Sequence, residues 1–300
     1  MTRPRNWGGI IPGMKKRHLV LYCALEVPLS DSKNILTGSF LEKQMGHVYL
    51  LGAGPGDPGL ITVRAVACLQ KADCVLFDAL VNPELLIQYA PHAAHIGVRK
   101  RKGRCERTQE ETTALLIRFA REGKTVARLK GGDPISFGRG AEEAIALQQA
   151  GVPFEIVPGV SCVSAVPAYA GIPITHRAHA SSFGVYSAHR QGGLTFSDAQ
   201  WKSIVTGPET RVLLMGKTRC REIMTTLIRF GMCPDTPAAI IYNGSLPNQR
   251  TLVGTVKNLP HRAERILEDG PALIIIGQVV SLRQQMMWVV EQVMEREAAS

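Results

Sequence analysis

L-K-G-G-D-P-I-S-F-G-R-G-A-E-E, residues 129–143, connects an apolar, β-like run (Thr125–Leu129) to a helical pattern (Ala141–Ala150). The stretch therefore lies where a parallel strand passes into a helix, which is the edge at which open α/β sheets bind ligands. Gly131 and Gly132 allow the backbone to approach a ligand closely. The alternative is a plain connection, but such loops usually run only about 2 to 6 residues. We therefore predict a binding loop.

Strand and helix patterns alternate on both sides of this loop, which predicts a parallel sheet with helices on its faces. The expected strands are His47–Leu51, Cys74–Phe77, Ala94–Val98, Thr125–Leu129 and Phe154–Val157. The expected helices are Leu60–Gln70, Pro83–Tyr89, Thr108–Glu122, Ala141–Ala150 and Val163–Ala170. Thr108, with Glu111 three residues later, is typical of a capping box at a helix start.

A second α/β pattern follows the break at Gly171-Ile172-Pro173. Its expected strands are Ser181–Ala188, Arg211–Met215, Ala238–Tyr242, Arg250–Val256 and Ala272–Ile276, and its expected helices are Asp198–Val205, Arg219–Phe230, Val256–Glu268 and Leu282–Arg296. The turn region at Asn243-Gly244 predicts a hairpin and therefore a mixed sheet. We predict a disordered or appended extension (1–45), an N-terminal α/β domain (46–172) and a C-terminal α/β domain (173–300), with a cleft between the two domains.

Composition excludes several classes of protein. The net charge of +10 favours an anionic partner, but the basic run Arg99–Arg107 contains no aromatic residue for base stacking, so we expect no nucleic acid. No apolar run is long enough to cross a membrane. Seven cysteines without a C-x-x-C pair favour a reducing cytoplasm. The histidines lack metal-binding spacing, and we predict no metal site.

The segment Gly54–Gly59 fits G-x-G-x-x-G, and Asp78 lies about where a ribose-binding acid would follow. A nicotinamide or flavin enzyme is therefore the main alternative interpretation. Against it, Asp57 would put a carboxylate where the pyrophosphate binds, and Pro55 and Pro58 lack the amide donors that bind phosphate.

Several blocks in order, from about Gly46 to Val290, give a specific resemblance. They are V-Y-L-L-G-A-G-P-G-D-P-G-L-I-T (48–62), F-D-A-L-V (77–81), K-G-G-D-P-I-S-F-G-R-G-A-E-E (130–143), V-P-G-V-S (157–161), A-G-I-P-I-T-H-R (170–177) and G-P-A-L-I-I-I-G (270–277). The chain resembles the tetrapyrrole methylases, and among them most closely the enzymes that methylate uroporphyrinogen III.

This resemblance implies an enzyme that uses S-adenosyl-L-methionine (SAM) to methylate C2 and C7 of uroporphyrinogen III, giving precorrin-2 for sirohaem or cobalamin biosynthesis. It also implies a homodimer. A cationic loop suits this substrate, because its many carboxylates would accept charge-assisted hydrogen bonds. A module that binds SAM without turnover is the alternative from another class.

The resemblance also implies site residues. The SAM-binding positions fall on Pro55, Gly131, Gly132, Asp133, Ser136, Ser161, Cys162, Met215, Gly244 and Ala272. On the substrate side, Asp78 corresponds to the proton acceptor and Lys100 to the proton donor, while Arg139, Glu142 and Arg177 lie in blocks that face the porphyrinogen. Structural alternatives stay open: Asp78 as a turn or helix-capping acid, Glu142 as a first-turn helix acid and Met215 as a core residue.

The chain departs from the family pattern at three places. Residues 100–111 read K-R-K-G-R-C-E-R-T-Q-E-E and lack a usual His and Ser, Ile135-Ser136 replaces a Phe and an aliphatic residue, and Ser187-Ala188-His189 stands where T-G-H is frequent. We expect these changes to leave the SAM framework intact and to alter the rim that binds substrate.

Overall fold

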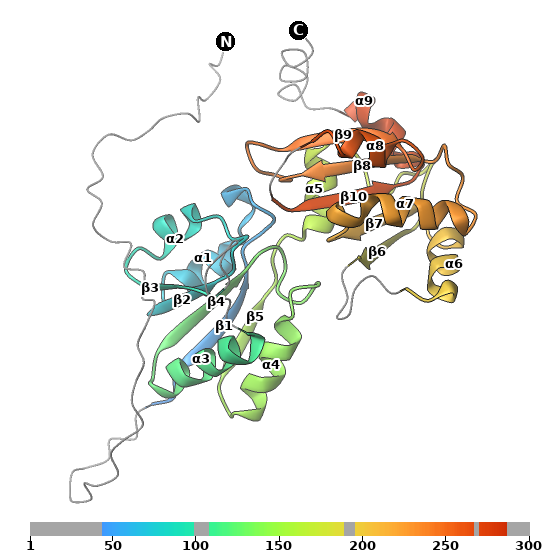
Figure 1. The fold of residues 1–300 in the computed structure, drawn as a ribbon. Helices are drawn as coiled ribbons and strands as arrows, with labels where there is room; N and C mark the ends of the chain where they lie inside the picture. Colours follow the sequence, from blue (N-terminus) through green and yellow to red (C-terminus); the bar gives the residue numbers. More distant parts are fainter. Residues whose placement is uncertain (1–43, 99–107, 189–195, 267–269, 287–300) are drawn as a thin grey trace, which may run out of the picture. The chain divides into compact units, whose positions relative to one another are not determined.

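The structure, a computed structural model, describes residues 44–98, 108–188, 196–266 and 270–286 (Figure 1). Its first sheet has five strands, β1 (His47–Gly52), β2 (Cys74–Phe77), β3 (Ala94–Gly97), β4 (Thr125–Lys130) and β5 (Phe154–Val157). They are arranged in the order β3-β2-β4-β1-β5, and every pairing is parallel. The carboxyl ends of all five strands therefore lie at one edge of the sheet.

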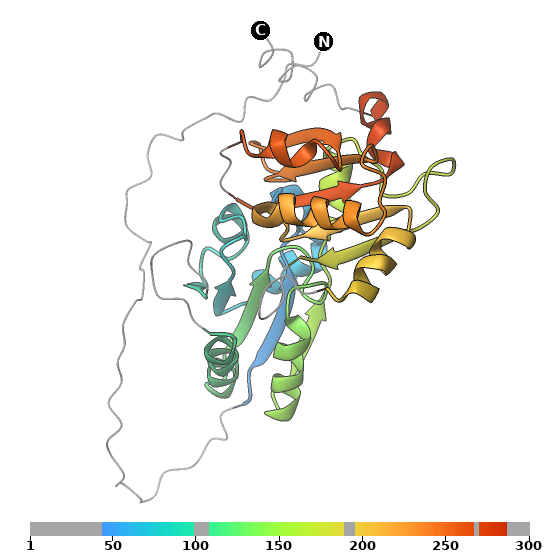
Figure 2. The same ribbon diagram turned by 45° about the vertical axis from the view of Figure 1, so that its right-hand side comes forward.

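Helices cover both faces of this sheet, as Figures 1 and 2 show. One face packs on α1 (Val63–Leu69) and α2 (Glu84–Tyr89), and the other on α3 (Gln109–Arg121) and α4 (Gly140–Gln149). The α3 helix begins with the predicted capping box, in which the Thr108 hydroxyl accepts from the Glu111 amide and the Glu111 carboxylate accepts from the Thr108 amide. The three layers bury two apolar clusters, one on each side of the sheet.

The second sheet contains β6 (Phe183–Ser187), β7 (Thr210–Leu214), β8 (Pro237–Tyr242), β9 (Arg250–Thr255) and β10 (Ala272–Ile276), in the order β6-β7-β10-β8-β9. Only β6 and β7 pair in parallel, and β8 and β9 form the predicted hairpin. Its helices are α6 (Asp198–Thr206), α7 (Cys220–Arg229) after a 3₁₀ turn (η2, Lys217–Arg219), α8 (Leu259–Ala263) and α9 (Arg283–Met286) after η3 (Gln278–Leu282). Two α/β domains with a parallel and a mixed sheet confirm the predicted fold class.

The predicted strands are all present, with ends that shift by no more than two residues. Two helix predictions are wrong in extent. The α1 helix starts at Val63 instead of Leu60, because a 3₁₀ turn (η1, Pro58–Leu60) precedes it and the Thr62 hydroxyl caps it by accepting from the Ala65 amide. The α8 helix starts at Leu259, since the Asn258 side chain accepts from the Thr255 amide in the turn before it. The predicted helix Leu282–Arg296 continues outside the described residues.

The helix α5 (Cys162–Tyr169) packs on the second sheet, although it follows the last strand of the first sheet. Its Val166, with Ala170 and Ile172 just after it, belongs to the same buried cluster as Val212 of β7 and Ile275 of β10. The division at residues 172/173 stays a prediction. The packing of α5 favours a boundary that lies before the helix, because the core that a segment joins defines its domain.

Three glycines bring the ends of β1, β4 and β5 into backbone contact. A Cβ on Gly52 would lie 2.4 Å from Gly159 Cα, and a Cβ on Gly159 would lie 2.3 Å from the Gly132 carbonyl oxygen. Backbone atoms cannot move aside as a side-chain tip can. The close approach of these loops therefore requires glycine at both positions.

We expect Gly52→Ala to destabilise the fold by about 3 kcal/mol, because its methyl group would overlap backbone. Gly97→Ala is a matched control, since Gly97 also ends a parallel strand but its Cβ would meet only Phe77 Cζ at 3.6 Å. The control should change stability by less than about 0.5 kcal/mol. Denaturant unfolding followed by circular dichroism measures both, and equal effects would contradict the steric account.

Candidate active site

The loops after β1 and β4 are joined by a short backbone bridge at the carboxyl edge of the first sheet. The Gly132 amide donates to the Gly54 carbonyl at 2.7 Å, and the Gly54 amide donates to the Gly132 carbonyl at 3.2 Å. Gly132 has φ +69°, and a Cβ there would meet only the Cys162 amide nitrogen at 3.9 Å. Among the described residues, the space at the Gly132 Cβ position is therefore open.

Asp133 organises the turn after Gly132. Its Oδ1 accepts from the amides of Ile135 (3.0 Å) and Ser136 (2.8 Å), and its Oδ2 accepts from the Gly159 amide at 3.1 Å. Burial alone would raise the pKa of Asp133, but these backbone hydrogen bonds outweigh it and hold the pKa below its ordinary value. The carboxylate therefore links the loop after β4 to the loop after β5.

The loop after β5 leads into α5, where the Ser161 hydroxyl accepts from the Val163 amide at 3.3 Å. Ser161 and Cys162 are thus at the helix start, with Cys162 beside the open space at Gly132. Burial raises the pKa of the Cys162 thiol, which keeps it protonated and makes it a poor nucleophile. The structure brings these two predicted positions together with Gly131, Gly132, Asp133 and Ser136.

The predicted positions of the second sheet share one edge. Met215 follows β7, Gly244 follows β8 and Ala272 begins β10, which pairs with both strands in antiparallel register. Met215 has φ +58° and is 50% exposed, so it is not a core methionine. Next to Gly244, Asn243 is buried in the left-handed region with φ +49°, and its side-chain nitrogen has no hydrogen-bond partner among the described residues.

Contacts between Asp57 and two other residues connect the loop that contains Pro55 with the second sheet. The Asp57 amide donates to the Ser245 hydroxyl at 3.2 Å, and the Tyr169 hydroxyl donates to Asp57 Oδ2 at 2.7 Å. Burial and this hydrogen bond raise the pKa of Tyr169 to about 12. Asp57 thus serves as a structural acceptor, in keeping with the argument that a carboxylate here opposes pyrophosphate binding.

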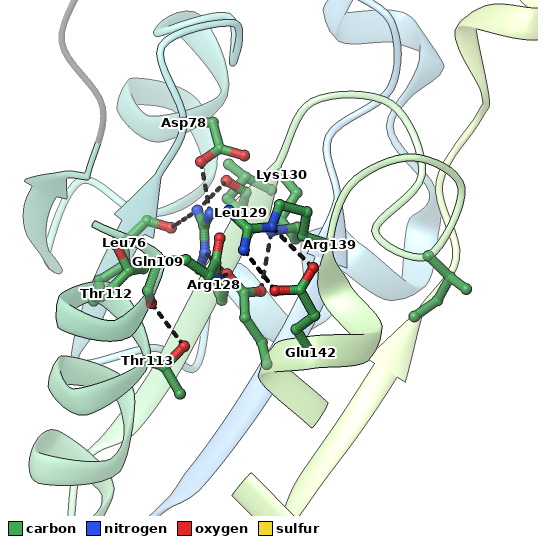
Figure 3. Close-up of polar contacts among 12 residues, drawn as sticks. Leu76, Asp78, Gln109, Thr112, Thr113, Arg128, Leu129, Lys130, Arg139 and Glu142 are labelled. Carbon is green, nitrogen blue, oxygen red and sulfur yellow. Dashed lines mark hydrogen bonds and ion pairs between the residues drawn. The ribbon is translucent and has the colours of Figure 1, made fainter. Parts of the chain in front are cut away.

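Charged side chains are buried beneath the carboxyl edge of the first sheet (Figure 3). Arg128 and Lys130 lie on the face of β4 that packs under α3 and α4, and both contact the fully buried Glu143 of α4 at 3.0 Å. Arg128 Nη2 also lies 2.6 Å from Asp78 Oδ1. Sequence reasoning missed Arg128, Lys130 and Glu143. The available signal was two cations two residues apart in an otherwise apolar strand, where a charge is rarely buried unless it is paired.

The charges in this cluster affect one another. Burial by itself would lower the pKa of Arg128, but attraction to Asp78 and Glu143 outweighs burial and raises it. Burial, followed by repulsion from Arg128, lowers the pKa of Lys130, and Glu143 opposes that change. The cluster therefore depends on its carboxylates to keep two cations in a low-dielectric environment.

Arg139 and Glu142 form an exposed bidentate pair at the start of α4, with distances of 2.9 and 2.6 Å. Arg139 has φ +59°, and its hydrogen bond to Glu142 lowers the pKa of that carboxyl. Arg177 lies in the exposed turn closed by the bridge between His176 and Ala180, and it forms no ion pair with the described residues. Lys100 lies outside the described residues.

Across the described ranges, no group of three or more His, Cys, Asp or Glu side chains is placed to hold a metal ion. None of the helices within those ranges is long and apolar enough to cross a membrane.

The family profile described as Tetrapyrrole (Corrin/Porphyrin) Methylases matches residues 47–260. The chain therefore belongs to the tetrapyrrole methylases, and the resemblance seen in the sequence is confirmed. Among solved structures, it is similar to the uroporphyrin-III C-methyltransferase from Thermus thermophilus, with 37% identity, a TM-score of 0.69, and coverage of 81% of this chain and 99% of that one. A cobalt precorrin-4 methyltransferase is similar too, with 30% identity, a TM-score of 0.69, and coverage of 78% of this chain and 95% of that chain.

The curated relatives are longer proteins. The chain is 40% identical to a sirohaem synthase of Hahella chejuensis over 95% of this chain and 61% of the relative. It is 45% identical to a sirohaem synthase of Azotobacter vinelandii over 82% of this chain and 53% of that protein. The matched region thus spans little more than half of each relative.

Asp133 predicts a pH dependence of stability. The pKa of Asp133 in the folded protein lies below the ordinary value of 3.8. The contribution of its carboxylate to the free energy of unfolding is therefore fully present above that pH and is lost as pH falls through the folded pKa. The stability difference between wild type and Asp133→Asn should therefore be constant above about pH 5 and narrow below pH 3.8. Thermal unfolding at a series of pH values measures this difference. A difference that stayed equal at pH 7 and pH 3 would contradict the assignment.

Proposed function

We propose that this protein is a SAM-dependent C-methyltransferase that converts uroporphyrinogen III to precorrin-2 by methylation at C2 and C7. The observation that carries the proposal is the open space beside Gly132, at the edge of the sheet where the partly exposed Asp78 also lies. Similarity to the Thermus uroporphyrin-III C-methyltransferase across 99% of that chain supports it. The product would enter sirohaem or cobalamin biosynthesis.

The residues present fit SAM as methyl donor. Another structure of the Thermus enzyme, 38% identical to this chain, is described as a complex with S-adenyl homocysteine. We assign the cofactor contacts to the loops after β1, β4 and β5 and to the edge with Met215, Gly244 and Ala272. SAM supplies a methyl group on a sulfonium that leaves as a neutral thioether. A site for SAM needs no hydrogen-bond donors for phosphate, so the missing amide N–H groups of Pro55 and Pro58 do not weaken its binding.

The exposed charges fit the substrate. Arg139 is 45% exposed and held by Glu142, so its guanidinium is pre-oriented and accessible to a carboxylate of the porphyrinogen. Arg177 and Lys100 stay predictions as further substrate contacts. The net charge of +10 would attract a polyanionic substrate.

Asp78 is the group that we assign to the proton chemistry. A pyrrole carbon is electron-rich, so the enzyme mainly has to orient it toward the donor, and a proton must leave after the new bond forms. The Asp78 side chain is 24% exposed, which gives substrate access to a carboxylate whose Oδ1 is held by Arg128. Its hydrogen bond to Arg128 argues against the alternative of a helix cap.

Anaerobic incubation of the protein with uroporphyrinogen III and SAM, followed by mass spectrometry, tests the function. We expect a product that carries two added methyl groups, and Asp78→Asn should lower kcat by about 10²-fold or more. Methylation of a later precursor alone would overturn the proposal. Binding of SAM without turnover would favour the binding module, and tight binding of NAD or NADP the dinucleotide enzyme. A homodimer and a cytoplasmic location are further parts of the proposal.

Gly132 provides a test of the cofactor site. Gly132→Val places a side chain in the open space and should weaken SAM binding by about tenfold or more, or about 1.4 kcal/mol. Gly151→Val is a matched control, because Gly151 has φ +67° against +69° for Gly132 and also has no atom close to its Cβ position. Both variants carry the same backbone strain. Calorimetry should show weakened SAM binding only for Gly132→Val, and equal losses would mean that strain alone is responsible.

A further inference from the structure

Arg128, Lys130, Glu143 and Asp78 form a largely buried ion cluster. Removing these charges from water costs free energy, so a contribution to stability is a weak explanation for their presence. Side-chain exposure is 3% for Arg128, 2% for Lys130 and 0% for Glu143. Replacing a buried ion pair by apolar residues of similar volume often leaves the stability of a protein unchanged or raises it. On the same face of β4, Val126 is apolar and fully buried. The charges begin only where the strand approaches the candidate site.

Arg128 is held from several directions. Its Nε donates to Glu143 Oε1 at 3.0 Å, and its Nη1 donates to the carbonyls of Leu129 (3.3 Å) and Leu76 (3.5 Å). Its Nη2 donates to Asp78 Oδ1 at 2.6 Å, the shortest of these bonds. Carbonyls of two adjacent strands and a buried carboxylate thus orient the guanidinium whose Nη2 contacts Asp78 (Figure 3).

Glu143 cannot by itself balance the two cations. It accepts from Arg128, from Lys130 Nζ at 3.0 Å and from the side-chain Nε2 of Gln109 at 2.9 Å, so its oxygens are shared among three donors. Asp78 supplies the second negative charge, and it is the only one of the four charged groups whose side chain is substantially exposed, at 24%. No described residue donates a hydrogen bond to Asp78 Oδ2. Within the described part of the chain, one oxygen is therefore held and the other accepts no hydrogen bond, which leaves it able to contact substrate.

We propose that Arg128 is a positioning residue for methylation: Glu143 fixes its guanidinium, and the guanidinium holds the Asp78 carboxylate in one orientation. The inference rests on the proposed function and deepens it. Arg128 acts through Asp78 and does not contact substrate. A carboxylate held in this way has already lost its rotamer freedom, so substrate binding need not order it.

A double-mutant cycle tests this role, with Arg128→Gln, Asp78→Asn and the double variant. Each is assayed for kcat and for KM of uroporphyrinogen III, and calorimetry gives the Kd of SAM. Arg128→Gln should lower kcat by about 10- to 100-fold, because misplacing a catalytic group by an ångström has effects of that size. KM and Kd should stay within about threefold, since Arg128 touches neither ligand.

The double variant decides between positioning and a general structural role. If Arg128 acts through Asp78, the double variant should be no slower than Asp78→Asn alone, within about threefold. A double variant whose loss equals the product of the two single losses would overturn the inference. So would an Arg128→Gln variant that loses SAM binding in proportion to kcat. A wild-type protein that methylates no uroporphyrinogen III would instead overturn the proposed function, and this inference with it.

Two further variants keep the test decisive if Arg128→Gln does not fold. Glu143→Gln keeps the shape of the anchor but removes its charge, and it should lower kcat with the same lack of additivity toward Asp78→Asn. Arg128→Lys should recover part of the activity, since it keeps the charge but cannot reach both carboxylates at once. Arg64→Gln is the matched control. Arg64 pairs with Glu155 at 2.6 Å in the same domain but is 55% exposed, and its loss should leave kcat unchanged.

Discussion

The close approach of three backbone segments at Gly52, Gly132 and Gly159 is the constraint on which the candidate site depends. These residues end or follow β1, β4 and β5, and a Cβ on Gly52 or Gly159 would overlap backbone. Because the segments touch, the Gly159 amide can reach Asp133 and the Gly54 amide can pair with Gly132. Backbone contacts therefore join the loops into one wall, and a ligand can lie against this backbone without ordering flexible side chains.

Beneath this wall, the buried charges connect the sheet to its helices. Glu143 of α4 forms ion pairs with both Arg128 and Lys130. Arg128 in turn holds Asp78, and Lys130 directly precedes the glycine turn. One carboxylate thus links the proposed catalytic group and the proposed cofactor loop. Such a network is expensive in a low dielectric unless every member is paired. Its members are paired, and the exposed side of Asp78 is where the cluster reaches the surface.

Much of the fold could be read from the sequence, because strand and helix periods are local properties. The strand positions, the capping box at Thr108 and the hairpin of β8 and β9 needed no tertiary information. The failures are equally physical. Leu60 looked helical by apolar spacing, but the cap at Thr62 starts the helix later. For α5, chain order predicts membership of the first domain, but chain order does not show which sheet a helix packs on, and α5 packs on the second.

For the site, sequence by itself determined the family, the glycine-rich loops and the candidate residues at strand ends, since these are patterns along the chain. It also singled out Asp78 and Arg139. Only the tertiary structure decided that Asp78 is bound to Arg128 and that Glu143 anchors Arg128 and Lys130. The reason is that these contacts join residues of different elements, and their partners depend on how helices pack on the sheet, which no local period encodes.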